Sequence, residues 1–156
     1  MTTEQEPQAR LPPRWVIRAF WRGHRAAYSA TSGRFGLRAP TADRWGMMRL
    51  RTIGRRSGEE RIAILGYYED GPDLVTMAMN GWADPEPAWW LNLQANPEAT
   101  IELPDGNTRA VTARPASGDE RRRLWQRFLD LGTSAFTEAN AEKRSVETAI
   151  VVFEPR

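Results

Sequence analysis

The hydrophobic and polar positions of this chain alternate with a period of two from about residue 46. Met48, Leu50 and Thr52 alternate with Arg49 and Arg51, which predicts a half-buried strand. Further runs are bounded by glycine-containing turns, so the strands predicted in this part cover residues 46–52, 60–68 and 73–80. Connections this short predict an antiparallel meander, because parallel pairing needs a long crossover.

The rest of the chain predicts three more strands and three helices. Residues 84–86 (Asp-Pro-Glu) have the composition of a helix start, and this helix should end near Asn96. Ser117 and Glu120 have the spacing of a capping box before a second helix, and Gly132 suits its C-terminal cap. A shorter helix is expected at 136–143, and the strands at 98–103, 108–114 and 146–153. Six strands with peripheral helices predict a mainly β (α+β) fold, an antiparallel barrel whose closure removes the exposed sheet edges.

Residues 1–45 are expected to be separate from the barrel domain at 46–156. A polar start and two prolines precede a predicted amphipathic helix at 14–28. Its basic side carries Arg14, Arg18, Arg22 and Arg25, and its apolar side carries Ile17, Phe20, Trp21 and Tyr28. Such a helix suits peripheral contact with an anionic membrane surface, or packs its apolar side against the barrel.

Composition restricts the chemistry that this chain can perform. Its 156 residues include no cysteine and a single histidine, His24. Disulfides, thiolate nucleophiles, cysteine- or histidine-based metal clusters and a histidine-based triad are thereby excluded, and no metal site is expected. His24 lies among arginines on the predicted surface helix, with too little around it for a catalytic role. If the chain is an enzyme, a cofactor should therefore carry the reactive atoms.

Charge is divided unevenly along the chain. Residues 1–61 hold 13 arginines against 5 carboxylates, a net charge of +8, whereas residues 62–156 have a net charge of −6. The basic part suits an anionic partner, which could be a nucleic acid, a membrane surface or a phosphorylated small molecule. The acidic second part and the lack of a nucleic-acid motif argue against nucleic acid. A cytoplasmic protein is expected, because no apolar run approaches the ~20 residues of a membrane span and the N-terminus does not resemble a signal peptide.

Two segments are candidates for ligand binding. The turn at 54–58 (Gly-Arg-Arg-Ser-Gly) offers backbone N–H groups, two guanidiniums and a hydroxyl to a phosphate or carboxylate, although a solvated basic turn has the same composition. The segment 77–82 precedes the tryptophan-bearing helix, and together they could hold a flat ring system or simply form core. Asn92 lies on that mostly apolar helix and needs a hydrogen-bond partner if it is buried.

Four segments in order resemble the deazaflavin-dependent nitroreductase family, which are split β-barrel oxidoreductases related to FMN-binding split barrels. These segments are LRTIGRRSGEER at 50–61, DGPDLVTMAMNG at 70–81, PAWWLNLQANP at 87–97 and IVVFEP at 150–155. The resemblance implies coenzyme F420, an 8-hydroxy-5-deazaflavin, as cofactor. It also implies hydride transfer from the reduced coenzyme to an electron-poor small molecule such as a quinone, an enone or a nitro compound.

The resemblance further implies a set of cofactor-binding residues. Those expected to bind the phosphate and the acidic glutamyl tail are Arg55, Arg56, Ser57 and Arg61. Those expected to line the deazaflavin ring are Ile62, Ala63, Ile64, Leu65, Met77, Ala78, Met79 and Asn80. Those expected to close the site are Ala88, Trp89, Trp90 and Asn92. No catalytic side chain is identified.

The chain also departs from the family pattern. Relatives often have lysine or Ser–Lys where Met79 and Asn80 stand and glycine where Trp82 stands, and Ala149 replaces a common proline. No tyrosine follows Tyr68, whereas relatives have tyrosines suspected of helping substrate reduction near 136–140. The resemblance therefore supports cofactor binding by this chain better than it supports nitroreduction. FMN, FAD or haem binding stays open as an alternative within the fold, and so does the oligomeric state.

Overall fold

The chain divides into two compact units, Met1–Gly36 and Leu37–Arg156. The computed structural model describes residues 15, 19, 22, 36–131 and 140–156. In the first unit, Trp15, Ala19 and Arg22 are helical. The rest of the predicted basic helix, the predicted cap at Gly132 and most of the short helix predicted at 136–143 lie outside the described residues.

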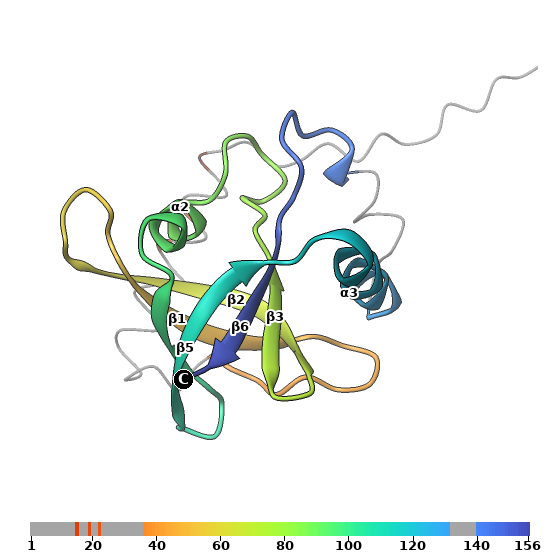
Figure 1. Cartoon of the computed structure of the whole chain (residues 1–156), viewed down its shortest axis with the longest axis horizontal. Coiled ribbons are helices and arrows are strands. Elements are labelled where there is room, and N and C mark those ends of the chain that lie inside the picture. Colours follow the sequence, from red (N-terminus) through yellow and green to blue (C-terminus); the bar gives the residue numbers. More distant parts are fainter. Residues whose placement is uncertain (1–14, 16–18, 20–21, 23–35, 132–139) are drawn as a thin grey trace, which may run out of the picture. The chain divides into compact units, whose positions relative to one another are not determined.

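The second unit contains a closed antiparallel barrel with strand order β1-β2-β3-β6-β5-β4 (Figure 1). Its strands are β1 (Gly46–Ile53), β2 (Glu60–Asp70), β3 (Asp73–Met77), β4 (Glu98–Glu102), β5 (Thr108–Pro115) and β6 (Ile150–Pro155). The meander β1–β2–β3 and the hairpin β4–β5 are both present, as the short turns predict. The predicted six-stranded antiparallel barrel is thus confirmed.

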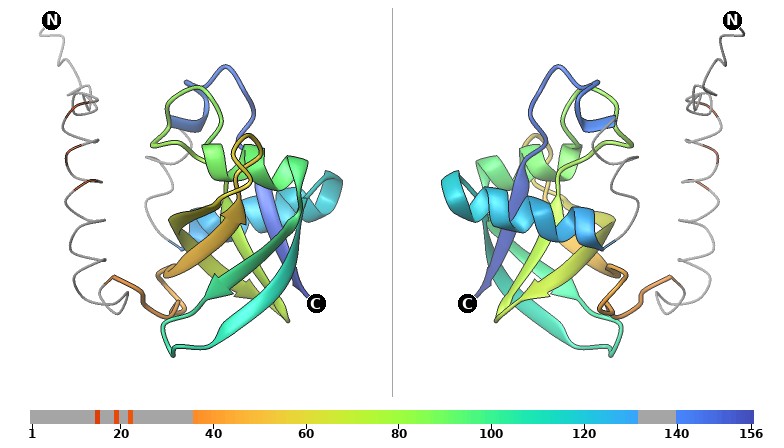
Figure 2. Two further views of the ribbon diagram at one scale, coloured as in Figure 1. Left: turned by 90° about the vertical axis from the view of Figure 1, so that its left-hand side faces the viewer. Right: turned by 90° about the vertical axis from the view of Figure 1, so that its right-hand side faces the viewer.

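Alternate residues of each strand fill the interior of the barrel. Met48 and Leu50 of β1 are fully buried there, and they pack in one cluster with Phe153 of β6. Helix α2 (Ala88–Ala95) adds Trp89 and Trp90 to the same cluster, so this helix closes one end of the barrel (Figure 2). Burying aromatic side chains of this size contributes strongly to stability, because each removes a large apolar area from water.

Helix α3 (Gly118–Asp130) covers the outer wall of the barrel (Figures 1 and 2). Its Leu124 and Phe128 form a second buried cluster with outward-facing residues such as Tyr68 and Val75. The Tyr68 hydroxyl donates a hydrogen bond of 2.9 Å to the Leu124 carbonyl, and its ring meets that of Phe128 edge to face at 4.7 Å. Two cores therefore form, one inside the barrel and one under α3.

Three predicted boundaries of helices and strands are wrong, all of them at the end of the barrel that α2 closes. Strand β3 ends at Met77 instead of residue 80, because the Met79 N–H turns back to the Met77 carbonyl at 2.9 Å. Helix α2 begins at Ala88 instead of residue 85, since the Asp84 carboxylate binds Ser145 and does not cap the helix. Strand β6 begins at Ile150 instead of residue 146.

The predicted capping box of α3 does not form. Ser117 occupies the N-cap position, but its side chain makes no cap hydrogen bond. Glu120 instead accepts hydrogen bonds of 2.8 and 2.9 Å from the guanidinium of Arg114, which also donates to Glu154 at 2.7 Å. A charge-assisted bidentate pair is stronger than the bond from a carboxylate to a backbone N–H, and β5 places Arg114 within reach. The helix ends at Asp130 and Leu131 is its C-cap, whereas the predicted cap Gly132 lies outside the described residues.

Candidate functional site

The basic turn between β1 and β2 is compact. The Gly54 N–H donates to the Glu59 carbonyl and the Gly58 N–H donates to the Gly54 carbonyl, both at 2.8 Å. Gly58 has a φ of +69°, a backbone conformation that costs a side-chain-bearing residue energy. A Cβ atom at Gly54 would lie 2.7 Å from the Ser57 hydroxyl oxygen, so a larger residue there would displace the Ser57 side chain or the turn. Arg55 and Arg56 of this closed turn are both exposed.

Asn92 of α2 fixes this turn against the barrel. Its side-chain oxygen accepts hydrogen bonds from the Arg55 backbone N–H at 3.2 Å and from Arg55 Nη1 at 3.3 Å. Its Nδ2 donates to the Thr52 hydroxyl at 3.4 Å, and the residue is only 4% exposed. The expectation that a buried Asn92 needs polar partners is confirmed, and the partner is the predicted anion-binding turn itself.

The arginines of the turn differ in their charge balance. Arg61 Nη2 lies 3.0 Å from a Glu59 carboxylate oxygen and donates to the Ser57 hydroxyl at 3.1 Å. Arg55 bonds through its side chain only to the neutral amide of Asn92 within the described part of the chain. Arg56 forms no side-chain hydrogen bond or ion pair with any described residue. Among the described residues, two exposed guanidiniums thus lack a carboxylate partner, and such groups are the donors that a phosphate or carboxylate ligand needs.

Residues 62–65, which are predicted to line the deazaflavin ring, lie alternately on the two faces of β2. Ala63 and Leu65 pack against the interior of the barrel. Ile62 lies on the opposite face with Ile64 and is 47% exposed. A ligand in contact with this strand from one side therefore meets only half of the predicted residues.

The segment after β3 is divided in the same way. Ala78 belongs to the interior cluster, whereas Met77 and Met79 pack with the cluster under α3. Asn80 is exposed and its Nδ2 donates to the Pro85 carbonyl at 3.2 Å. On α2, Ala88 is exposed while the two tryptophans are buried with their ring centroids 6.3 Å apart. The structure brings the turn and Asn92 together, and leaves most of the aromatic surface of α2 in the core.

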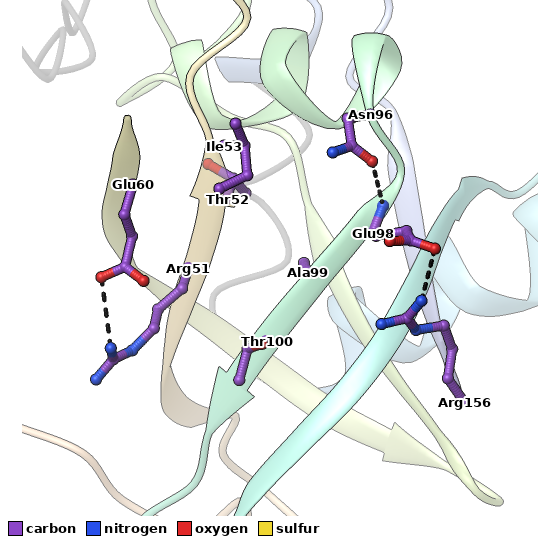
Figure 3. A pocket seen from close by; sticks show the side chains of 9 residues that line it. All are labelled: Arg51, Thr52, Ile53, Glu60, Asn96, Glu98, Ala99, Thr100 and Arg156. Carbon is purple, nitrogen blue, oxygen red and sulfur yellow. Dashed lines mark hydrogen bonds and ion pairs between the residues drawn. The ribbon is translucent and has the colours of Figure 1, made fainter. Parts of the chain in front are cut away.

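A small pocket of about 200 Å³ lies where β1 and β4 separate (Figure 3). These strands pair only over Arg49–Arg51 and Thr100–Glu102, so their further ends diverge. The pocket contains two guanidiniums, but Arg51 is paired with Glu60 at 3.4 Å and Arg156 with Glu98 at 2.6 Å. Balanced charges and a volume below the roughly 300–1,000 Å³ of ordinary ligand sites make it a poor match for an anionic coenzyme.

Sequence reasoning missed two polar residues of this end of the barrel. Thr52 was predicted only as a residue on the buried face of β1, yet its hydroxyl accepts the hydrogen bond from Asn92. Arg144 was not among the predicted residues, but its side chain is fully buried and it donates to the Ala78 carbonyl at 3.2 Å. Hydrogen bonds from Ser145 keep the pKa of the nearby Asp84 carboxyl below its usual value. A buried arginine has no local sequence signal, because only the folded chain brings Ala78 to it.

The barrel fold is shared with solved structures of other proteins. A solved structure described as an F420-H2 dependent reductase (FDR-A) superposes with a TM-score of 0.61 and 24% identity, covering 69% of this chain and 93% of that one. Another, described as a domain-swapped dimer, superposes with a TM-score of 0.64 and 23% identity, covering 92% of this chain and all of the other. These likenesses concern the fold.

The chain itself belongs to the F420H(2)-dependent quinone reductase family, whose model matches residues 20–155. An F420H(2)-dependent quinone reductase of Mycobacterium tuberculosis is 35% identical over 131 residues, which cover 80% of this chain and 85% of the relative. The family is one of oxidoreductases that use coenzyme F420, so the expected enzyme class and cofactor are confirmed. Within the described residues, no helix is long and apolar enough to cross a membrane.

The donor set of the turn fits this coenzyme. The phosphate and glutamyl carboxylates of F420 are anions, and the two guanidiniums without carboxylate partners are exposed on one turn. That turn is held to α2 by a buried amide, so its donors are positioned before any ligand arrives. Preorganised donors lose less conformational entropy on binding.

Proposed function

We propose that this protein binds reduced coenzyme F420 at the basic turn and passes a hydride to a quinone. The observation that carries the proposal is the bonding of Arg55 to the buried Asn92, beside a second arginine that has no described partner. Membership of the family supports quinones as the substrate class. An enone or a nitro compound is an alternative acceptor, since each is also electron-poor.

The chain's own residues would act mainly by binding and orientation. Arg55 and Arg56 would hold the phosphate and the glutamyl tail, with the Ser57 hydroxyl and Arg61 as further donors. When bound, the coenzyme supplies the hydride, and no side chain is required to carry electrons. Helix α2, whose tryptophans close this end of the barrel, would keep water from the ring. Holding the two reactants together is the main contribution expected of the protein.

Spectral titration with oxidised coenzyme F420 tests the binding step. The unmodified protein should bind saturably, and an Arg55→Ala/Arg56→Ala double variant should bind at least 10-fold more weakly, because it loses two charge-assisted contacts. Arg123→Ala is the matched control. That arginine is exposed and paired with Asp70 at 2.8 Å, so its loss should leave coenzyme affinity unchanged. Tight binding of FMN together with no binding of the deazaflavin would contradict the proposal.

Peripheral membrane contact through residues 14–28 is a further proposal that rests on the sequence. The helix predicted there would carry four arginines on one side, and each could contribute about 1 kcal/mol at an anionic surface. Contact with a membrane would suit a lipophilic quinone. Co-sedimentation with anionic liposomes at low salt, comparing the full chain with one that starts at Ala30, tests this. A full chain that stays in the supernatant would exclude the contact.

A further inference from the structure

Thr52 places a buried hydroxyl on an otherwise apolar row of β1. Met48 and Leu50 precede it on the same face of the strand and are fully buried, and Thr52 itself is 2% exposed. Valine has a similar shape and the same branching at Cβ, so it would fill this space as well. A buried hydroxyl costs free energy unless it is hydrogen-bonded. Packing alone therefore does not account for a threonine at this position.

The partner of that hydroxyl is Asn92 of α2, which is 4% exposed. Its Nδ2 donates to the Thr52 hydroxyl at 3.4 Å, and its Oδ1 accepts from the backbone N–H and the Nη1 of Arg55 at 3.2 and 3.3 Å. If the amide were turned over, Nδ2 would face two donors of Arg55, and both would lose their acceptor. Thr52 thus supplies the acceptor that Asn92 needs in the orientation that serves Arg55.

These bonded groups lie directly beneath the basic turn. In the register of β1 and β2, Thr52 stands opposite Arg61, and the turn begins two residues later at Gly54. Thr52, Asn92 and Arg55 therefore form a row that runs from the buried end of β1 to an exposed guanidinium. The buried end of that row has fixed positions, because both of its members belong to packed elements of the barrel.

The Thr52–Asn92 pair carries no charge, and this matters for the guanidinium that it holds. A carboxylate in place of the amide would also bind Arg55, but it would neutralise the charge that an anionic ligand needs. The neutral amide orients Arg55 and leaves that charge without a carboxylate partner among the described residues. Two apolar side chains could replace the pair at little cost in stability, since neither would leave a polar group unsatisfied. The polar pair is therefore better explained by ligand binding than by stability.

We propose that Thr52 is a positioning residue for the coenzyme, which it does not touch and which it affects through Asn92 and Arg55. The inference rests on the proposed function, in which Arg55 binds the phosphate or the glutamyl carboxylates. With the hydroxyl present, Asn92 holds Arg55 at two atoms, so the other N–H groups of the guanidinium are oriented before the coenzyme arrives. Without the hydroxyl, Nδ2 has no buried acceptor in that orientation and the amide is less firmly held. The arginine then loses more conformational entropy when it binds the anion.

Spectral titration with oxidised coenzyme F420 measures this effect. Thr52→Val should bind the coenzyme about 5-fold more weakly than the unmodified protein, and Thr52→Ser should stay within about 2-fold of it, because serine restores the acceptor. Thr76→Val is the matched control. Thr76 is also 2% exposed, and its hydroxyl donates to the Gly66 carbonyl at 2.6 Å on another strand pair. Unchanged affinity in Thr52→Val, or an equal loss in Thr76→Val, would overturn the proposal.

A double-mutant cycle shows whether Thr52 acts through Arg55. In a protein that already carries Arg55→Ala, the further change Thr52→Val should weaken coenzyme binding by less than about 2-fold, because the guanidinium that it positions is gone. The full loss of about 5-fold in that background would mean that Thr52 acts by another route, and the proposal would fail.

A second double variant separates positioning from stability. Thr52→Val/Asn92→Leu removes both polar partners, so it should unfold at a higher temperature than Asn92→Leu alone, which leaves the Thr52 hydroxyl without its partner. Its coenzyme affinity should nevertheless stay at least about 5-fold below that of the unmodified protein. Recovery of affinity together with stability would show a merely structural role. Failure of the unmodified protein to bind coenzyme F420 would instead overturn the proposed function.

Discussion

The side-chain oxygen of Asn92 accepts two hydrogen bonds from Arg55, one from its backbone N–H at 3.2 Å and one from its Nη1 at 3.3 Å. Asn92 is buried on α2, and Arg55 stands at the tip of an exposed turn 37 residues earlier in the chain. The contact therefore connects the core of the barrel to the donors of the candidate anion site. Stability and coenzyme binding should both depend on it.

Replacing Asn92 tests this connection. Asn92→Leu should lower the free energy of unfolding by about 1–3 kcal/mol, because the N–H of Arg55 and the Thr52 hydroxyl lose a buried partner. Coenzyme affinity should fall as well, since the turn is no longer fixed. Urea unfolding and spectral titration measure the two effects. Gln94→Ala on the exposed side of the same helix is the control and should change neither.

Adding a methyl group at Gly54 tests the compactness of the turn. The new Cβ would lie 2.7 Å from the Ser57 hydroxyl oxygen and 3.3 Å from the Glu59 carbonyl oxygen, so the Ser57 side chain or the turn backbone has to shift. We expect Gly54→Ala to cost about 1–3 kcal/mol of stability and to weaken coenzyme binding. Gly66→Ala is the matched control on β2, because its Cβ would meet neighbours at ordinary contact distances of 3.6 Å or more. Equal effects of the two substitutions would contradict this view of the turn.

Tyr67 should make the protein sensitive to alkali. Burial, assisted by the nearby Glu69 carboxylate, raises the pKa of Tyr67 to about 12 from its usual 10.0. Between pH 10 and 12 the unfolded chain loses this proton and the folded chain keeps it, so stability falls as pH rises through this window. A shift of two pKa units corresponds to about 2–3 kcal/mol. Urea unfolding from pH 9 to 12 should therefore decline less steeply for Tyr67→Phe, and parallel curves would refute the assignment.

Ser117 should contribute little to α3 despite its N-cap position. Its side chain makes no cap hydrogen bond, so Ser117→Ala should cost less than ~0.5 kcal/mol, compared with about 1 kcal/mol for an ordinary N-cap serine. Glu120→Gln weakens the pair with Arg114, which is about one-third exposed, and should cost up to about 1 kcal/mol. Thermal unfolding of the two variants compares them directly. A larger loss for Ser117→Ala would show that the cap forms in solution.

The sequence by itself determined the barrel and its strand order within each hairpin. Alternation of Met48, Leu50 and Thr52 with arginines identifies the buried face of β1, and the glycine-containing turns leave only antiparallel connections. These features are local, because the energies that favour a strand or a tight turn come from residues a few positions apart. The same locality allowed the basic turn to be identified as a candidate anion site.

Only the tertiary structure decided which polar groups meet. The Arg55–Asn92 contact spans 37 residues and the Arg144–Ala78 contact spans 66, and each depends on the register of strands that close the barrel. The failed capping box involves a pair only six residues apart, but Glu120 meets Arg114 because β5 places that arginine beside the start of α3. Such pairs are chosen by competition among all the donors and acceptors that folding brings together, and the pattern of residue types along the chain does not show which pair forms.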